Sequence, residues 1–315
     1  MSNFNPVCVI ESLLHYMGLT TTQNIMKTKL LLTSAFLLTL MVGNVSAQDN
    51  NFNLDEVYSL SSDGTIHLKS EDANVKITGS DRTDVHVVID RAETSRGIRS
   101  NRSRFDIEVE ERQGDLYIQE PSQRGVTFQI GTSRVAYKIE IEMPKTGSLR
   151  IKGDDDDYVI RSVNGEISIE TDDGDVELIE CNGDKFDIQL EDGDLRMDGG
   201  KGSLYIRVDD GDVDVRNGAF ERLEVDAEDG NMSLETSLSD NGRYELSGDD
   251  ANIDFVVLGG GGEFNVVMDD GRVSASSAFK TIQETEDRSR LQLDGGTANV
   301  DIRIEDGRVR LSTSN

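Results

Sequence analysis

The chain has 315 residues, a formal net charge of −29 and a sequence pI of about 4.3. This charge argues against nucleic acid as a partner, because phosphate binding needs a clustered basic surface. Thirty Gly, three Pro and 36% hydrophobic residues describe a folded chain that is rich in turns and long enough to bury a sizeable core.

A targeting segment is predicted at residues 26–47. It has a basic head, an apolar run from Leu30 to Val42 and small residues that end at Ala47. Because the apolar run is shorter than the roughly 20 residues that cross a bilayer, a secretory signal peptide is favoured over a membrane anchor. Residues 1–25 precede this complete signal peptide, which indicates an upstream misreading of the gene. We therefore expect an exported protein that is periplasmic, cell-surface or extracellular, and not an integral membrane protein.

Residues 48–148 are predicted to form an irregular N-terminal cap of strands. Alternating apolar residues predict strands at 85–89, 105–109, 115–118 and 134–143, and a polar basic loop interrupts them. This loop is the only positive feature of an acidic chain. We expect it to contact an anionic envelope protein or polysaccharide, or the acidic repeats of another copy; the alternative is a merely solvated loop. The arginines expected to make this contact are Arg96, Arg99, Arg102 and Arg104.

Residues 149–315 contain an acidic repeat in which two acids precede a glycine. With that glycine as slot zero, the steps between copies are 19, 18, 19, 21, 20 and 36 residues. The longest step is two of 18, and Ser289 at its midpoint marks a degenerate copy. Two further copies lie upstream, with Asp156 and Ala73 in slot zero. The slot-zero residues of the other copies are Gly174, Gly193, Gly211, Gly230, Ala251, Gly271 and Gly307.

Apolar residues keep fixed places around slot zero, at minus seven, minus five, plus two and plus four. Each copy is therefore two short strands with one buried face. An antiparallel meander with Asp-Gly hairpin turns and a stack of coils both fit this pattern. The stack is favoured because the similarity runs between copies at a constant period. We predict an all-β, single-domain β-solenoid, similar to a parallel β-helix, with coils of about 19 residues.

The segment VAYKIEIEMPKTGSLRI and the repeats VNGEISIETDDGDVELIECNG resemble the bacterial putative-adhesin family, a β-strand-repeat domain of unknown function. The resemblance runs from about Tyr58 to Leu311. It implies a secreted or envelope-associated β-helix-like domain without established catalysis, and it carries no site residues.

Stacked coils would align the acids in a column that a cation could relieve of its charge repulsion. Calcium is one hypothesis, loosely bound divalent cations another. Acidic turns that only keep the protein soluble are the alternative, because neither the nonapeptide calcium repeat nor an EF-hand loop is found. The candidate metal ligands are Asp172, Asp173, Asp192, Asp209, Asp210, Asp229, Asp249, Asp250, Asp269, Asp270 and Asp306.

We expect an adhesin-like structural or binding module of the cell envelope, not an enzyme. The alternatives are a carbohydrate-active β-helix enzyme and an envelope-stress accessory protein. Against catalysis, the acids are spread evenly over the copies, the chain has no Trp, and no hydrolase or zinc motif occurs. The segment Gly259–Phe264 interrupts the repeat with four glycines, and its simplest interpretation is a flexible corner insertion. Cys181 is expected to be a small buried or semi-buried side chain rather than a nucleophile.

Overall fold

The computed structural model describes residues 51–99, 105–121 and 129–314. The predicted upstream extension, the signal peptide, Arg102 and Arg104 lie outside these residues. Contacts divide the chain into two compact units. In the smaller one, the described residues are the end of one strand (95–99) and the start of another (129–133). The larger unit, Asp49–Thr94, Asn101–Val126 and Arg134–Asn315, contains the repeats.

The described residues form twenty strands and no helix, so the all-β prediction is confirmed. The described residues contain no helix that is long and apolar enough to cross a lipid bilayer. The strands are β1 (Phe52–Ser59), β2 (Thr65–Lys69), β3 (Asn74–Ser80), β4 (Asp84–Arg99), β5 (Glu108–Arg112), β6 (Asp115–Gln119), β7 (Gln129–Pro144), β8 (Ser148–Lys152), β9 (Asp157–Arg161), β10 (Ile167–Asp173), β11 (Val176–Ile179), β12 (Lys185–Asp192), β13 (Leu195–Asp198), β14 (Lys201–Asp210), β15 (Val213–Ser237), β16 (Arg243–Gly259), β17 (Gly262–Ala275), β18 (Phe279–Glu284), β19 (Arg288–Leu293) and β20 (Ala298–Thr313).

Equivalent strands of neighbouring repeats pair in parallel and in register. Ile167 pairs with Phe186 in the strand before the corner, and Val176 pairs with Leu195 in the strand after it. The predicted stacking of repeats is thus confirmed, and the meander is excluded for these copies.

We number the stacked repeats, or rungs, in spatial order: rung 1 is β6 with the end of β7, rung 2 is β2 and β3, rung 3 is β8 and β9, rung 4 is β10 and β11, rung 5 is β12 and β13, rung 6 is β14 and the start of β15, rung 7 is the rest of β15, rung 8 is β16, rung 9 is β20 and rung 10 is β17.

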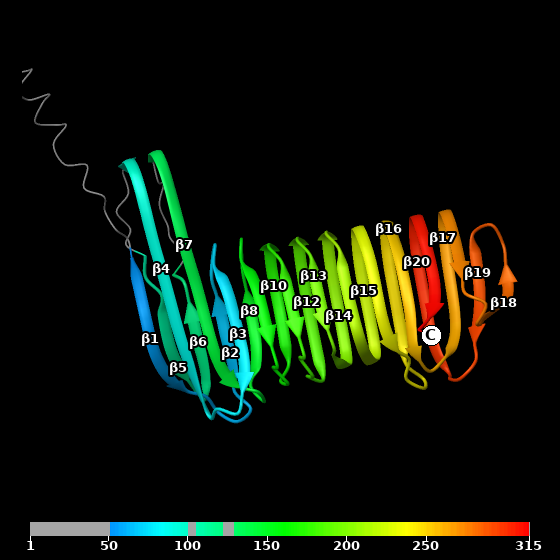
Figure 1. Cartoon of the computed structure of the whole chain (residues 1–315), viewed down its shortest axis with the longest axis horizontal. Helices are drawn as coiled ribbons and strands as arrows, with labels where there is room; N and C mark the ends of the chain where they lie inside the picture. Colours follow the sequence, from blue (N-terminus) through cyan, green and yellow to red (C-terminus); the bar gives the residue numbers. More distant parts are fainter. Residues whose placement is uncertain (1–50, 100–104, 122–128, 315) are drawn as a thin grey trace, which may run out of the picture. The chain divides into compact units, whose positions relative to one another are not determined.

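The chain leaves its sequence order at both ends of this stack. Rung 2 lies between rungs 1 and 3, although its residues precede both in sequence. At the other end, β20 pairs with β16 on one side and with β17 on the other, as Figure 1 shows. Successive repeats therefore do not always stack on one another, contrary to the simple coil order expected from the sequence.

Three sequence predictions are corrected here. The degenerate copy at Ser289 is not a coil: it belongs to β19, which pairs antiparallel with β17, and Ser289 faces Val266. The stretch 48–148 is less irregular than expected, because β6 and the end of β7 form rung 1 beside rung 2, where the copy predicted at Ala73 is confirmed. The basic segment is not a loop throughout, since Arg96 and Arg99 lie in β4.

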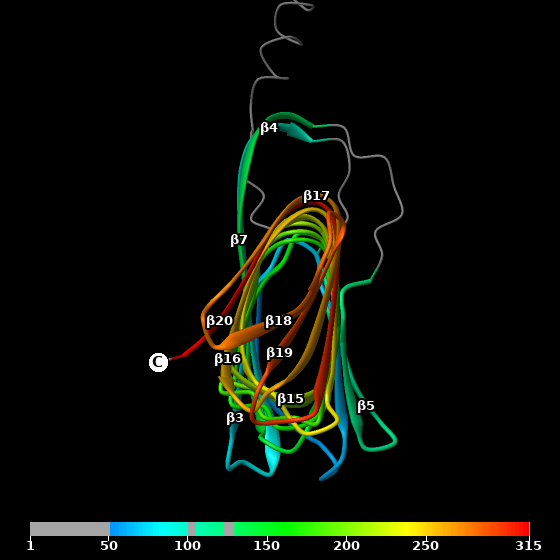
Figure 2. The same cartoon turned by 90° about the vertical axis from the view of Figure 1, so that its right-hand side faces the viewer.

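The inward residues of the rungs form the core, and Figure 2 views the stacked rungs end-on. The strands alternate buried and exposed positions, so that Phe186, Ile188 and Leu190 point inward while Asp187 and Gln189 face out. Truncating one such core side chain to Ala costs about 2–5 kcal/mol. Cys181 is fully buried, as expected, and burial raises the pKa of its thiol.

The corner glycines meet two demands at once. Gly193 has φ +142°, and a Cβ there would lie 2.2 Å from the carbonyl oxygen of Gly174 in the rung below. Where slot zero carries a side chain, the residue three places earlier becomes small. Gly248 makes room for Ala251, since a Cβ on Gly248 would lie 2.8 Å from the Ala251 Cβ. The corner is therefore set by the close approach of neighbouring rungs as well as by backbone conformation.

Candidate functional site

The aspartates one place before slot zero form a continuous row along one corner of the stack. Each is exposed and paired in register with its neighbours, which confirms the predicted column. The spatial order differs from the sequence order at the end, because Asp306 lies between Asp250 and Asp270. In spatial order the members are Asp155, Asp173, Asp192, Asp210, Asp229, Asp250, Asp306 and Asp270.

Crowding within this acidic corner row is visible at its first members. A hydrogen bond with the Asp155 carboxyl raises the pKa of Asp173, and the nearby charges of Asp155 and Asp192 add to the effect. Burial raises the pKa of Asp72, and Asp155 contributes again. A proton or a cation is thus held more easily at this corner than on isolated carboxylates.

The remaining candidate ligands lie two places before slot zero, outside the paired register. The register of β10 with β12 passes from Thr171 to Asp173 and leaves Asp172 unpaired. Asp209, Asp249 and Asp269 occupy the equivalent position in their rungs and, like Asp172, are exposed. In the described ranges, no three His, Cys, Asp or Glu side chains gather closely enough to hold a metal ion. Calcium binding therefore stays a hypothesis.

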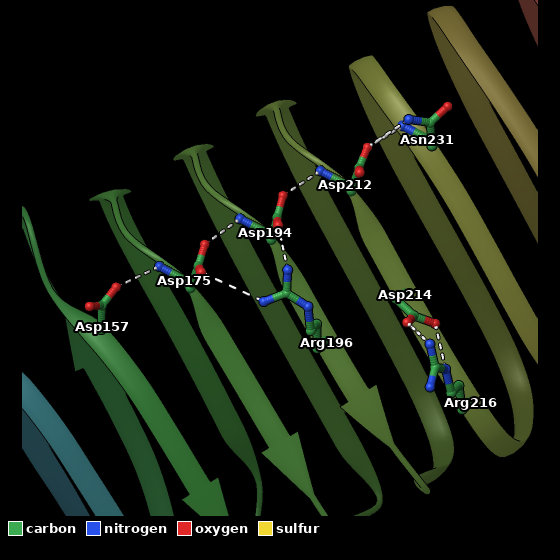
Figure 3. Close-up of polar contacts among 8 residues, drawn as sticks. All are labelled: Asp157, Asp175, Asp194, Arg196, Asp212, Asp214, Arg216 and Asn231. Carbon is green, nitrogen blue, oxygen red and sulfur yellow. Dashed lines mark hydrogen bonds and ion pairs between the residues drawn. The ribbon is translucent and has the colours of Figure 1, made fainter.

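A second acidic row, not singled out from the sequence, follows slot zero by one residue (Figure 3). The Asp157 carboxylate accepts the backbone N–H of Asp175 at 3.2 Å, and Asp175 accepts that of Asp194 at 3.0 Å. Asp194 and Asp212 repeat this contact toward the next rung, at 3.0 and 2.9 Å. The signal was present in the motif itself, because the glycine is followed by Asp in rungs 4 to 6.

Arginines on the same outer face lie among these carboxylates. Arg196 contacts Asp194 at 2.6 Å and Asp175 at 3.6 Å, so it bridges two rungs. Arg216 contacts Asp214 through two hydrogen bonds, of 3.1 and 2.6 Å. Exposed pairs of this kind contribute little to stability, because solvent screens both charges. These ion pairs hold the side chains of the face in position, and the paired charges remain accessible to a partner.

A buried polar cluster replaces the glycine corner in rung 3. Asp156, in slot zero, is fully buried and accepts hydrogen bonds from the Ala73 backbone N–H at 2.5 Å, Ser70 Oγ at 3.1 Å and the Tyr158 hydroxyl at 3.0 Å. Burial raises the pKa of Asp156, and these donors oppose that shift. The cluster ties rungs 2 and 3 together, which is a structural role.

Glu120 lies in the same corner at the N-terminal end of the larger unit. Burial raises its pKa to about 7. Its Oε2 accepts the Glu71 backbone N–H at 3.3 Å, and the Arg91 charge partly offsets the shift. The Tyr137 hydroxyl is buried beside it, and burial raises the pKa of that hydroxyl above its usual range. Glu120 thus changes its charge near neutral pH.

The predicted arginine site is described only in part. Arg96 and Arg99 are strand residues of β4, whereas Arg102 and Arg104 lie outside the described residues. Arg91, in the same strand, forms an ion pair with buried Glu93 at 3.2 Å, and its guanidinium lies 4.5 Å from the centre of the Phe105 ring. Arg91 therefore stabilises the packing around Glu93 and Phe105. Contact of the other arginines with a partner stays a prediction.

A cavity of about 700 Å³ lies beside Arg91, between β1, β4 and β7. Asp90 is the only acid that lines it, so the described lining lacks the paired carboxylates of a glycosidase. Its other lining residues include Phe52, Ala136, Tyr137 and Lys138.

The family model described as Toastrack DUF4097 matches residues 64–312. Among solved structures, a putative adhesin from Bacteroides fragilis NCTC 9343 is 13% identical over 82% of this chain and 97% of its own, with a TM-score of 0.46. A putative adhesin from Parabacteroides distasonis ATCC 8503 is 13% identical over the same shares, with a TM-score of 0.40. Among curated proteins, none matches. The family model spans all the rungs, as the resemblance over residues 58–311 predicted, and the chain belongs to the Toastrack DUF4097 family.

Proposed function

We propose that this chain is an exported β-solenoid that acts as an adhesin-like binding module of the cell envelope and does not catalyse a reaction. The observation that carries the proposal is the acidic corner row. It presents one exposed carboxylate per rung, from Asp155 to Asp270, at the spacing of paired strands, about 4.8 Å. A regular array of like charges suits a polymeric or multivalent partner better than a single small substrate.

The partner that fits this row is a cationic envelope polymer or protein, or an anionic one bridged by divalent cations. Calcium belongs to the second case, because carboxylates are its preferred ligands. The described cavity lining supports binding over glycoside hydrolysis, since only Asp90 is acidic there. The signal peptide predicted at residues 26–47 supports export.

A pull-down from intact envelopes, with and without chelator, tests the proposal. We expect the purified protein to retain an envelope component, and Asp192→Asn, Asp210→Asn and Asp229→Asn together to reduce retention at least fivefold. Loss of retention on chelation would assign a bridging cation. The matched control removes three acids from the other face by Asp187→Asn, Glu224→Gln and Glu245→Gln. Equal retention by both triple variants would refute the role of the row.

The arginines are tested in the same assay. Replacing Arg96, Arg99, Arg102 and Arg104 with Ser should reduce retention only if the basic segment also contacts the partner. Turnover of acidic or neutral polysaccharides by the purified protein would replace the binding proposal with the carbohydrate-active alternative.

A further inference from the structure

We propose that the chain binds a second copy of itself, antiparallel and face to face, through the outer face of the strands that follow the acidic corners. This face is made by the residues one, three and five places after slot zero in rungs 3 to 10. It is separate from the acidic corner row and from the basic segment, so the inference is independent of the proposed function.

The charge of the plus-one residues changes sign along the stack. Rungs 3 to 6 carry Asp, rungs 7 and 8 carry Asn, and rungs 9 and 10 carry Arg. The register places these residues side by side, with Asn231 on Asn252, Asn252 on Arg308, and Arg308 on Arg272. In spatial order they are Asp157, Asp175, Asp194, Asp212, Asn231, Asn252, Arg308 and Arg272. One row therefore has an acidic half and a basic end.

Neither end of this row is neutralised within its own row. Arg308 and Arg272 are exposed neighbours of like charge, and no salt bridge in the described residues involves either of them. At the acidic half, the carboxylates of Asp157 and Asp175 each accept a backbone N–H of the next rung and remain exposed; Arg196 lies 3.6 Å from Asp175, whereas no ion pair in the described residues involves Asp157. Like charges at rung spacing repel, so each half is stabilised by an opposite charge from outside.

A second copy turned about a two-fold axis parallel to the strands supplies that charge. Such a rotation reverses the order of the rungs and keeps the order of residues along each strand, so each row faces itself in reverse. With the axis between rungs 6 and 7, rung 3 faces rung 10 and rung 4 faces rung 9. Asp157 then faces Arg272 of the second copy, and Asp175 faces its Arg308. In the centre, Asp194 and Asp212 face the Asn252 and Asn231 side chains.

The plus-three row is complementary in the same arrangement. Glu177 of rung 4 then faces Arg310 of rung 9 in the second copy, and Arg196 of rung 5 faces its Asp254 of rung 8. Within one chain Arg196 lies beside Glu177, and Arg310 pairs with Asp254 at 3.1 Å, so the contact between copies would extend these pairs. Asp214 of rung 6 faces Ser233 of rung 7. The plus-three row contains both acidic and basic residues, but in this arrangement no residue faces one of like charge in the second copy.

The plus-five row agrees. Arg216 of rung 6, which pairs with Asp214 of its own chain, faces Glu235 of rung 7 in the second copy, and Asp198 of rung 5 faces the apolar Val256 of its rung 8. Ile179 faces Ser312. Three rows with independent sequences are therefore compatible with one symmetry axis.

Shifting the second copy by one rung destroys the match. In one direction Asp212 and Asp214 each face their own equivalents, and Glu177 faces Asp254. In the other direction Arg196 faces Arg310, and Asp214 faces Asp254. Like charges in contact oppose both registers. Of these three registers, the sequence of the face therefore favours the one with the axis between rungs 6 and 7.

The size of the face predicts a weak dimer. Eight rungs at about 4.8 Å and five residues at about 3.3 Å give roughly 600 Å² per copy, the lower end of specific interfaces. Because the contacts are exposed ion pairs, association should weaken as salt rises.

Sedimentation equilibrium of the purified protein tests the inference. At 50 mM NaCl we expect a monomer–dimer equilibrium that shifts to monomer at 500 mM NaCl. Variant X, Arg308→Glu with Arg310→Glu, and variant Y, Asp175→Arg with Glu177→Arg, should each dissociate at least tenfold more readily. In an equimolar mixture, X and Y should restore the wild-type affinity to within threefold, since each substituted charge again faces an opposite charge across the interface.

The control changes the same charge on the other face, by Arg222→Glu with Arg243→Glu, and should leave the dimer intact. Thermal melts confirm that each variant folds. A wild-type protein that stays monomeric at all concentrations in low salt would overturn the inference. So would a mixture that fails to restore dimerisation, or a control that weakens it as much as variant X.

Discussion

At the scale of single residues, the corner positions decide whether rungs can approach one another. Most rungs use glycine in slot zero because the next carbonyl oxygen lies where a Cβ would be, as at Gly174, 2.2 Å from the oxygen of Asp156. Rung 8 avoids the problem with Ala251 by placing Gly248 three residues earlier. The corner thus needs one small residue of a pair, and the position of that residue varies.

We predict that Gly193→Ala lowers the free energy of unfolding by about 2–4 kcal/mol, because it combines positive φ with a steric clash against backbone. Ala251→Gly, in the equivalent slot, should cost about 1 kcal/mol or less. Urea unfolding of both variants measures the difference. Equal costs would show that the approach of the rungs does not constrain slot zero.

Glu120 gives a pH dependence of stability. Its folded pKa, about 7, lies above the ordinary value of 4.5, so the folded state binds the proton more tightly than the unfolded state. The stabilisation is fully present below pH 4.5 and is lost as the pH rises through 7. Allowing for partial exposure, the loss is about 2 kcal/mol.

Glu120→Gln should therefore reduce the fall in unfolding free energy between pH 5 and pH 8 by that amount, measured by urea unfolding at both values. Glu245→Gln, at an exposed position on an outer face, is the control and should behave as the wild type. If the two variants show the same pH dependence, burial does not control this carboxyl.

At the scale of elements, the chain crosses over a rung near each end of the stack. The run Gly259–Gly262 links β16 to β17 while β20 lies between them. Gly262 has no room for a side chain, since a Cβ would lie 2.1 Å from the Ala298 carbonyl oxygen. Near the N-terminal end of the larger unit, Lys145–Gly147 passes from β7 to β8 over rung 2, where Lys145 N–H donates to the Ser80 carbonyl at 3.0 Å. The glycine run is thus a packed crossing, and the expectation of a flexible insertion is wrong.

We predict that Gly262→Ala loosens β20 and lowers the free energy of unfolding by about 2–4 kcal/mol. Hydrogen exchange should rise across Ala298–Thr313 before it rises in β12. Gly259→Ala is the control, because its nearest contact would be an ordinary 3.9 Å from Ser237 Oγ. Unchanged exchange in β20 of the Gly262 variant would argue against a crossing under steric constraint.

At the scale of the larger unit, charge is arranged by rung and by face. The acidic corner row keeps one sign throughout, whereas the plus-one row of the face after the corner changes sign between Asp212 and Arg308. The first arrangement suits an extended partner, and the second suits a second copy of the chain. Because β20 lies between rungs 8 and 10, it is held by ladders on both sides, and it cannot separate from the stack without breaking both.

The repeat period, the inward apolar positions and the acidic corner row could all be predicted from the sequence, because each depends on a local pattern that recurs at the same slot. Asp173, Asp192 and Asp210 align simply because their rungs have nearly equal lengths. The rung order could not be predicted. Pairing β16 with β20 or with β17 buries equivalent apolar residues, so the local pattern does not distinguish the two orders. The same holds for the self-complementary face, whose symmetry is visible only once Arg308 is known to lie between Asn252 and Arg272 in the stack.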